Sequence, residues 1–306
     1  MTHALVLAGG GVTGVAWETG VLMGLRDSGH DIISNLDLVV GTSAGSTVGA
    51  QILSGTDLAD LYASQTAESH HEISPQLDLD ALAIIFGEMA LGGTTTDEQR
   101  VRIGELALAA TTVDEATRRA VIEKRLPSHD WPTIPLILTA IDAVTGEFVT
   151  WAKDSGVSLV DAVTSSCAVP SVWPCVTING RRYYDGGLRN SANAYLATGH
   201  SDVFVTAPIT SGPSPIVDAE LNDLRASGST IRMIVADTEA IEAMGEGFEI
   251  PEGCHLVIEV IEYDDGLLST CLDIAEATIK PSELTVLTRD VDTDTELSRA
   301  TYGNWL

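Results

Sequence analysis

A strand, a sharp turn and a helix follow one another at residues 36–53, which read LDLVVGTSAGSTVGAQIL. The run from Leu36 to Val40 is short and apolar, as expected for a buried strand of a parallel sheet. Val48 to Leu53 continue as a helix behind the turn. Between them, Gly41-Thr42-Ser43-Ala44-Gly45 fits the pattern G-x-S-x-G, in which small residues permit a sharp bend that exposes the serine hydroxyl. The stretch predicts a strand–turn–helix unit with Ser43 as a candidate nucleophile.

A similar unit opens the chain. His3 to Ala8 form an apolar run, Gly9-Gly10-Gly11-Val12-Thr13-Gly14 follows, and Val15 to Asp27 show helical spacing of apolar residues. A glycine turn before a helix N-terminus presents backbone N–H groups to an anion. A dinucleotide site would need an acidic residue at the end of the second strand, but Asp37 stands at its start. A P-loop is excluded because no Gly-Lys-Ser/Thr follows the glycines.

Strands and helices continue to alternate along the chain. A helical insertion or cap is expected at about 57–126, with helices at Leu58–Glu68, Leu79–Leu91, Glu98–Ala110 and Val113–Leu126. Further strands are expected at Pro135–Asp142, Glu147–Trp151, Val176–Ile178, Arg181–Tyr184, Val203–Thr206, Ile231–Ala236 and Leu256–Ile261, with a helix at Leu159–Cys167. This order predicts an α/β fold with a mostly parallel sheet covered by helices on both faces.

The charge of the chain limits its partners. The 306 residues carry 16 Lys and Arg against 44 Asp and Glu, a net charge of −28. Because the basic residues are few and dispersed, we expect no nucleic-acid partner, which would require clustered cations against phosphate. Residues 211–306, with 20 acidic and 5 basic side chains, form an acidic C-terminal part to which the sequence assigns no role.

Metal, disulfide and membrane signals are weak. The four cysteines form no CxxC pair, and His70-His71-Glu72 is better explained as solvated surface than as a metal site, so we expect no metal and no cofactor. No signal peptide or apolar run long enough to span a bilayer is visible, which favours a cytoplasmic location. The sequence leaves the oligomeric state open.

Asp185 belongs to a third glycine-containing motif. It opens Asp185-Gly186-Gly187, directly after a hairpin whose turn is Asn179-Gly180. Asp-Gly is also common in hairpin turns, so this signal is weak by itself. A Ser-Asp-His triad is an alternative that would use His200 or His255, although no pattern around either histidine marks it as catalytic.

Taken together, GGGVTG, GTSAG and DGG, in this order, resemble the patatin-like phospholipase family of serine–aspartate lipid acyl hydrolases. The resemblance includes Ser165–Pro170 and Tyr184–Leu188 and reaches to about Ala207. It implies one patatin-like domain over 1–306, a three-layer α/β/α sandwich, with core motifs within 3–207. It also implies Ser43 as nucleophile, Asp185 as base and the Gly10 and Gly11 amides as oxyanion hole. The supporting motif glycines are Gly9, Gly14, Gly41, Gly45, Gly186 and Gly187.

The resemblance further implies cleavage of fatty-acyl esters of glycerolipids or related lipids. One departure bears on the substrate, because Thr13 stands where the family usually carries Lys or Arg. This and the negative charge argue against an anionic bilayer, yet leave room for transient membrane contact through the segment Leu79–Leu91. A non-catalytic protein that binds a nucleotide or another anion at the Gly9–Gly14 loop is the alternative from a different class.

Overall fold

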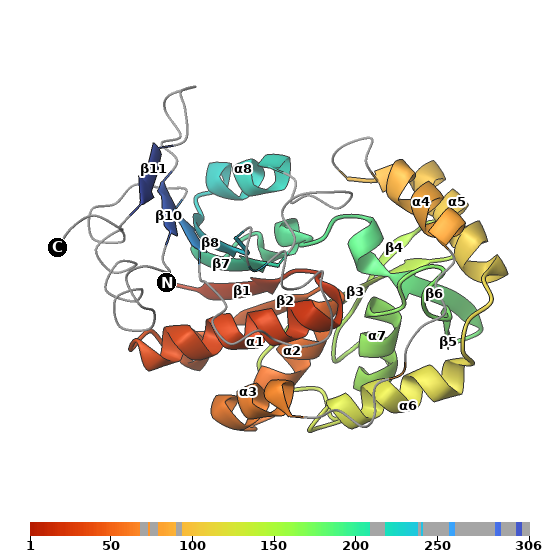
Figure 1. Ribbon diagram of the computed structural model, residues 1–306, viewed down its shortest axis with the longest axis horizontal. Coiled ribbons are helices and arrows are strands. Elements are labelled where there is room, and N and C mark those ends of the chain that lie inside the picture. The colour runs from red at the N-terminus through yellow and green to blue at the C-terminus, as the bar shows by residue number, and fades with distance from the viewer. Residues whose placement is uncertain are drawn as a thin grey trace.

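The central feature of the fold is one mixed sheet. The computed structural model describes residues 1–67, 73, 79–89, 94–208, 218–237 and 240, and the backbone of strands at 257–260, 285–288 and 298–301. The strands follow the order β11-β10-β9-β8-β7-β1-β2-β3-β6-β5, and β4 also pairs with β3 (Figure 1). They are β1 (His3–Leu7), β2 (Leu38–Gly41), β3 (Leu136–Asp142), β4 (Phe148–Trp151), β5 (Val176–Ile178), β6 (Arg181–Asp185), β7 (Asp202–Ala207), β8 (Thr230–Val235), β9 (Val257–Val260), β10 (Thr285–Thr288) and β11 (Ser298–Thr301).

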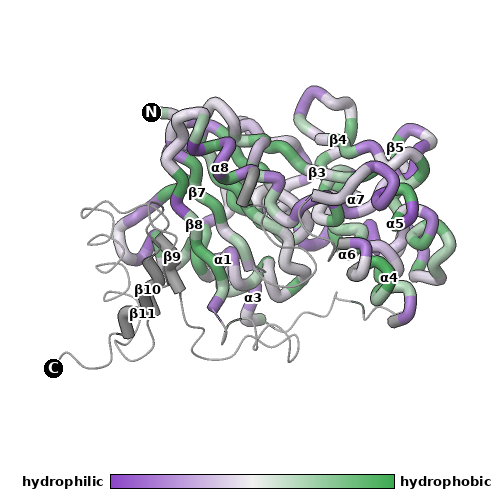
Figure 2. The backbone as a smooth tube through the Cα atoms, turned by 90° about the horizontal axis from the view of Figure 1, so that it is seen from above, coloured by the Kyte–Doolittle hydropathy of each residue, from purple (hydrophilic) through white to green (hydrophobic). Residues whose placement is uncertain are grey.

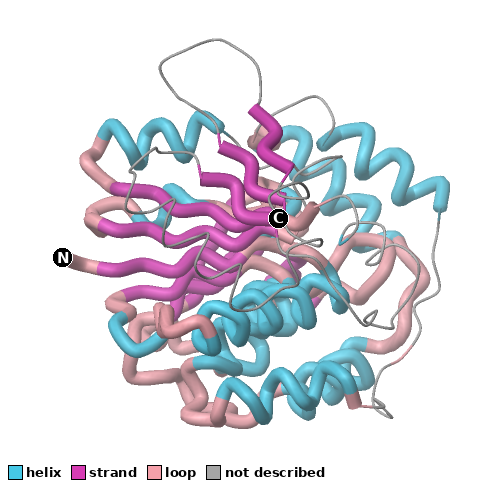
Figure 3. The backbone as a smooth tube through the Cα atoms, turned by 60° about the vertical axis from the view of Figure 1, so that its left-hand side comes forward, coloured by secondary structure: helices cyan, strands magenta, loops and turns pink. Residues whose placement is uncertain are grey.

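Helices cover both faces of this sheet, as Figure 3 shows. The α-helices are α1 (Gly11–Asp27), α2 (Ala44–Ile52), α3 (Leu58–Thr66), α4 (Leu79–Met89), α5 (Asp97–Ala109), α6 (Glu115–Arg125), α7 (Leu159–Ser166) and α8 (Asp218–Ala226). Short 3-10 helices are η1 (Ile33–Asn35), η2 (Gly186–Leu188) and η3 (Ala194–Ala197). The expected three-layer α/β/α sandwich is therefore confirmed.

The strands in the middle of the sheet run parallel to one another. β8, β7, β1, β2 and β3 are successive parallel neighbours, whereas β4 and β6 run antiparallel to β3 and β9 runs antiparallel to β8. The expectation of a mostly parallel sheet is confirmed. The sequence pattern missed β10 and β11, which extend the edge of the sheet beyond β9.

Side-chain alternation along β3 separates the two apolar layers. Leu136, Leu138 and Ala140 join the core beneath α2 and α7, whereas Ile141 packs on the opposite face, among residues of α4 and α5. This period of two is what a strand buried on both faces requires. Figure 2 shows the strands as an apolar centre between more hydrophilic outer segments. The core thus fixes which side of each strand faces which helix.

The helical stretch at 57–126 contributes to both layers. Leu58 and Leu61 of α3 and Ile122 of α6 pack into the same core as α2 and α7, whereas Ile85 of α4 and Ile103 of α5 pack on the other face. The four helices therefore belong to the sandwich itself. None of the helices in the part of the chain that the structure describes is long and apolar enough to cross a bilayer.

Candidate active site

Ser43 lies in a strained turn between β2 and α2. Its backbone has φ 53° and ψ −117°, a conformation that residues with a Cβ seldom adopt. Close packing explains the glycine that follows, because a Cβ on Gly45 would lie 2.1 Å from the Leu7 carbonyl oxygen. Helix α2 starts at Ala44, earlier than the sequence pattern indicated, so Ser43 stands directly at its N-terminus.

The C-terminal end of α7 holds the backbone of this turn. The Ser43 N–H donates to the Ser166 hydroxyl at 3.0 Å, and the Ser43 carbonyl accepts from the Cys167 thiol at 3.1 Å. The Ser46 hydroxyl donates to the same carbonyl at 2.6 Å. These buried contacts add to the backbone hydrogen bonds of the turn, among them that of the Ser46 N–H to the Ser43 carbonyl at 2.9 Å. They supply the external support that a strained conformation needs in order to persist.

Strand register brings Asp185 to the level of Ser43. Gly41, at the end of β2, is paired with Leu138, and Asp185, at the end of β6, is paired with Ala140 two residues further along β3. Because β6 runs antiparallel to β3, its last residue points back toward the turn that follows β2. The Ser43 hydroxyl is hydrogen-bonded to the Asp185 carboxyl. The structure thus brings the two candidate catalytic side chains into direct contact.

Burial determines the electrostatics of Asp185. The residue is 2% exposed, and this desolvation raises the pKa of its carboxyl from about 3.8 to about 7. Two hydrogen bonds, from the Ser43 hydroxyl and from the Gly187 N–H at 2.8 Å, oppose the shift by stabilising the charged form. The carboxyl is thereby tuned close to the pKa of about 6.5 that makes imidazole a useful base near neutral pH.

The glycine loop lies beside this pair. A Cβ on Gly9 would lie 3.4 Å from the Ser43 Cβ, and the Gly9 N–H donates to the Ser191 carbonyl at 2.8 Å. Gly11 begins α1 with φ +66°, in the left-handed region that favours glycine. Within the described residues, the Gly10 and Gly11 amides have no hydrogen-bond acceptor. Two unsatisfied N–H groups at a helix N-terminus are suited to an anion or an oxyanion.

The remaining motif glycines lie where side chains would collide. A Cβ on Gly10 would lie 2.8 Å from carbon atoms of Pro208, and one on Gly186 would lie 2.3 Å from the Thr139 hydroxyl. The corresponding positions on Gly14, Gly41 and Gly187 would contact Ala44, the Gly45 carbonyl and the Asp185 carboxyl, respectively. The candidate site is therefore surrounded by backbone segments in close approach.

The two histidines do not join this group. His200 precedes β7, whereas Ser43 follows β2, and both strands run parallel to β1. The two residues therefore lie at opposite ends of the parallel strands, which for a six-residue strand means a separation of about 20 Å. His200 instead places its ring nitrogen 3.0 Å from the Ala197 carbonyl. His255 lies outside the described residues, as does His70-His71-Glu72.

Sequence reasoning missed a buried acid in α1. Glu18 is fully buried and accepts hydrogen bonds from the Thr206 hydroxyl, at 2.7 Å, and from the Ala8 amide, next to the glycine loop. Burial raises the pKa of its carboxyl well above the usual value. Its helical position gave no signal, because a single acid among apolar residues normally lies on the exposed side of a helix. No group of three metal-binding side chains exists among the described residues.

Comparisons with known proteins agree with this geometry at the level of family. An α/β/α sandwich with a serine beside a buried carboxyl is the arrangement that a serine–aspartate hydrolase needs. The model of the patatin-like phospholipase family matches residues 5–198. The chain therefore belongs to the patatin-like phospholipase family, and this membership supports a lipid hydrolase.

The solved structures to which this chain is similar include two bacterial proteins. VipD from Legionella pneumophila is 15% identical with a TM-score of 0.38, and the match covers 96% of this chain and 63% of VipD. ExoU from Pseudomonas aeruginosa, in complex with SpcU, is 18% identical with a TM-score of 0.34, covering 79% of this chain and 49% of that one. This chain thus spans less than two thirds of either relative's length. No curated protein sequence matches it.

The raised pKa of Asp185 predicts the pH dependence of any reaction in which this carboxylate accepts the serine proton. The carboxyl must be ionised to act as a base, so activity should be lost as pH falls through about 7. Below that point kcat/KM should fall about tenfold per pH unit. The measurement is kcat/KM for a para-nitrophenyl ester between pH 5 and 9. A profile that stays flat down to pH 5 would contradict the assignment.

If the Gly10 and Gly11 amides bind the oxyanion, the backbone conformation of Gly11 should matter for catalysis, even though there is space for a side chain. Gly11→Ala meets no atom within 4 Å, but places a Cβ at φ +66°. It should rotate the amides away from the developing oxyanion and lower kcat by about 10² to 10³, the typical loss for one donor. The matched control is Gly29→Ala, also unobstructed, with φ +88° beyond the other end of α1. Equal kcat values for the two variants would argue against an oxyanion hole here.

Proposed function

We propose that this chain is a serine esterase that cleaves fatty-acyl esters through an acyl-Ser43 intermediate, with Asp185 as the base. The observation that carries the proposal is the hydrogen bond between the Ser43 hydroxyl and a buried carboxyl whose pKa is about 7. A serine is a weak nucleophile at neutral pH unless a base within hydrogen-bond reach removes its proton. Membership of the patatin-like phospholipase family supports a lipid ester as the substrate.

Acylation begins when the Ser43 oxygen attacks the ester carbonyl carbon while its proton moves to the Asp185 carboxylate. The carbonyl oxygen becomes an oxyanion, which accepts hydrogen bonds from the Gly10 and Gly11 amides. Collapse of this intermediate breaks the bond to the alcohol, which takes the proton from Asp185 as it leaves. The acyl group is then bound to Ser43, and Asp185 is again ionised.

Deacylation repeats these steps with water in place of serine. Asp185 accepts a proton from the attacking water, and the Gly10 and Gly11 amides again stabilise the oxyanion. Release of the fatty acid returns the proton to the Ser43 oxygen. One carboxyl therefore serves as base and acid in turn, and no imidazole is required.

Charge near the site favours neutral esters as substrates. Thr13, in the first turn of α1, supplies a hydroxyl where many relatives carry a cation. Arg189, close to Asp185 in sequence, is already paired with Glu220 at 2.8 Å and is not free to bind a phosphate headgroup. The net charge of −28 adds a long-range repulsion from anionic surfaces. Phospholipids, neutral glycerides and thioesters all offer Ser43 a carbonyl carbon to attack. Phospholipids with an anionic headgroup differ from the other two in being repelled by the negative charge of the protein.

The dyad predicts matched losses on removal of either partner. Ser43→Ala and Asp185→Asn should each abolish hydrolysis of a para-nitrophenyl acyl ester, and the double variant should be no worse, because the two side chains act as one unit. His200→Ala is the control and should keep nearly full activity. A single variant with near-normal turnover, or a double variant far below both singles, would contradict the proposal.

Thermal melting separates this loss from misfolding. The folded pKa of Asp185, about 7, lies above the unfolded value of about 3.8, so this group lowers stability progressively as pH rises from about 4 to about 7, and the whole penalty is present above pH 7. Asp185→Asn removes that buried charge and should melt no lower than wild type at pH 8. A large fall in melting temperature would attribute the lost activity to unfolding.

The missing cation predicts a preference among substrates. Initial rates on neutral acyl esters should exceed those on anionic phospholipid vesicles of matched chain length. Added salt should narrow the difference, because the Debye length falls to about 10 Å at 0.1 M. Thr13→Arg should narrow it further through local attraction to phosphate. Wild-type preference for anionic vesicles at low salt would contradict the electrostatic argument and leave the Ser43–Asp185 assignment intact.

A further inference from the structure

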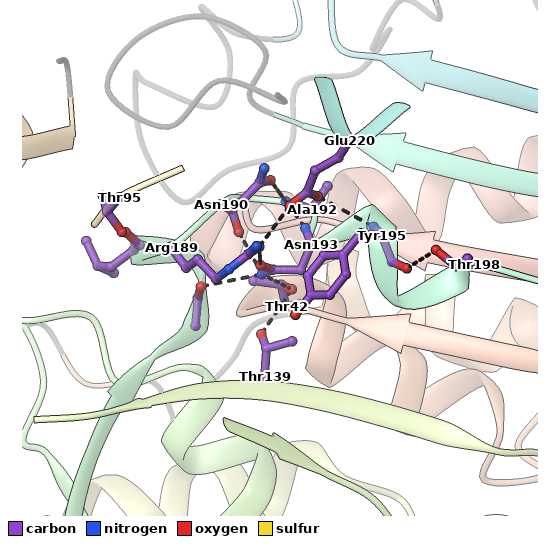
Figure 4. Close-up of polar contacts among 12 residues, drawn as sticks. Thr42, Thr95, Thr139, Arg189, Asn190, Ala192, Asn193, Tyr195, Thr198 and Glu220 are labelled. Atoms are coloured by element: carbon purple, nitrogen blue, oxygen red, sulfur yellow. Dashed lines mark hydrogen bonds and ion pairs between the residues drawn. The ribbon is translucent and has the colours of Figure 1, made fainter. Parts of the chain in front are cut away.

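One buried amide touches both turns that carry the candidate catalytic residues. Asn193 is fully buried and has φ 51°, in the left-handed region. Its Nδ2 group donates to the Thr42 hydroxyl at 3.2 Å (Figure 4). The same group donates to the Gly186 carbonyl at 3.4 Å. Thr42 directly precedes Ser43, and Gly186 directly follows Asp185. The amide therefore bridges two segments that are distant in sequence and must meet with ångström accuracy.

The bridge is part of a buried polar network. The Asn190 carbonyl accepts from the same Nδ2 group at 2.7 Å, and the Thr139 hydroxyl on β3 donates to the Thr42 hydroxyl at 3.0 Å. The Thr42 hydroxyl thus accepts from two sides, beneath the Ser43 turn. A buried network of this kind favours one geometry, because breaking one of its hydrogen bonds leaves a buried polar group unsatisfied.

An ion pair fixes the orientation of the Asn193 amide. Arg189 donates through one nitrogen to the side-chain oxygen Oδ1 of Asn193 and to the Glu220 carboxylate, both at 2.8 Å. Its guanidinium also lies against the Phe148 and Tyr195 rings, 4.9 Å and 4.5 Å from their centres. With its oxygen held by Arg189, the amide must point its NH₂ group toward Thr42 and Gly186.

Glu220, the partner of Arg189, lies on helix α8. Glu220 is 8% exposed, and α8 begins beyond residue 198, where the family match ends. The α8 side chains Leu221 and Leu224 are buried in the same core as Val203 and Val205 of β7, so the helix is a firm anchor for Glu220. A segment outside the motifs is therefore tied to the turn that bears the nucleophile.

We propose that Asn193 is a positioning residue, which holds the Ser43 turn against the Asp185 turn, and that the Arg189–Glu220 pair keeps its amide in place from α8. The inference rests on the proposed function of Ser43 and Asp185. Asn193 itself touches neither reacting atom. Because displacement of a catalytic group by about 1 Å lowers rates by about 10², loss of the bridge should reduce kcat far more than it changes KM.

Two substitutions separate the amide donor from the backbone conformation. Asn193→Gly keeps access to φ 51° and removes the side chain, whereas Asn193→Asp keeps the shape and the acceptor for Arg189 but loses the NH₂ donor. Both variants should lower kcat for a para-nitrophenyl ester, and the rate of Ser43 labelling by a fluorophosphonate, about 10- to 100-fold. KM should change less than about threefold, since Asn193 is fully buried and touches neither reacting atom.

A double-mutant cycle tests whether the effect passes through Thr42. Thr42→Val removes the acceptor hydroxyl, so its loss and that of Asn193→Asp should not add. On α8, Glu220→Gln should slow labelling, whereas Asp223→Asn, the same change at an exposed site on that helix, should not. Additive losses, or equal labelling of the two α8 variants, would overturn the network.

The outcomes distinguish this inference from the function on which it rests. A wild type that neither hydrolyses the ester nor reacts with the fluorophosphonate overturns the proposed function, and the inference with it. A reactive wild type with folded Asn193 variants labelled at the same rate overturns the inference alone. If both Asn193 variants fail to fold, the labelling rate of folded Thr42→Val decides in the same way.

Discussion

A carboxyl that must take a proton from a serine without help from a histidine has to be both buried and in contact with that serine. Exposed to water, Asp185 would have a pKa of about 3.9 and would be too weak a base. Buried but displaced, it could not reach the hydroxyl. The fold meets both conditions through β3, whose register aligns the end of β6 with the turn after β2. Because β3 lies between β2 and β6 in the sheet, its register with both strands determines whether Asp185 can reach Ser43.

This arrangement makes the folded state less stable at Ser43 and Asp185. Ser43 is held at positive φ, and burial of the Asp185 carboxyl destabilises the ionised form that the proposed reaction requires. The surrounding elements offset these terms by dense packing and by buried hydrogen bonds from α7 and from Asn193. Functional residues are a usual location for such strain, because the same contacts that fix the geometry also compensate for it.

Features that short-range sequence patterns encode could be predicted from the sequence, whereas features that depend on contacts between distant segments could not. The glycine loop, the serine turn and most strands carry local signals of composition and periodicity, and the structure contains each of these elements. Asn193 and Glu18 carry no such signal, since their roles depend on which distant backbone atoms surround them. Helix α2 begins earlier than its apolar pattern suggested, at Ala44, where Gly45 packs against Leu7 of β1, a contact that residues 36–53 alone do not reveal. Strands β10 and β11 were likewise missed.

A dyad of this kind moves one negative charge rather than creating a pair of charges. In the proposed reaction the charge leaves the desolvated carboxylate of Asp185 and appears on the oxyanion facing Gly10 and Gly11. Those amides belong to the N-terminus of α1, where the helix dipole and unsatisfied N–H groups stabilise an anion. The charge thus moves from a group that burial destabilises to a site that the backbone favours. A protein with few cations can catalyse ester hydrolysis in this way, because backbone amides supply the electrostatic stabilisation.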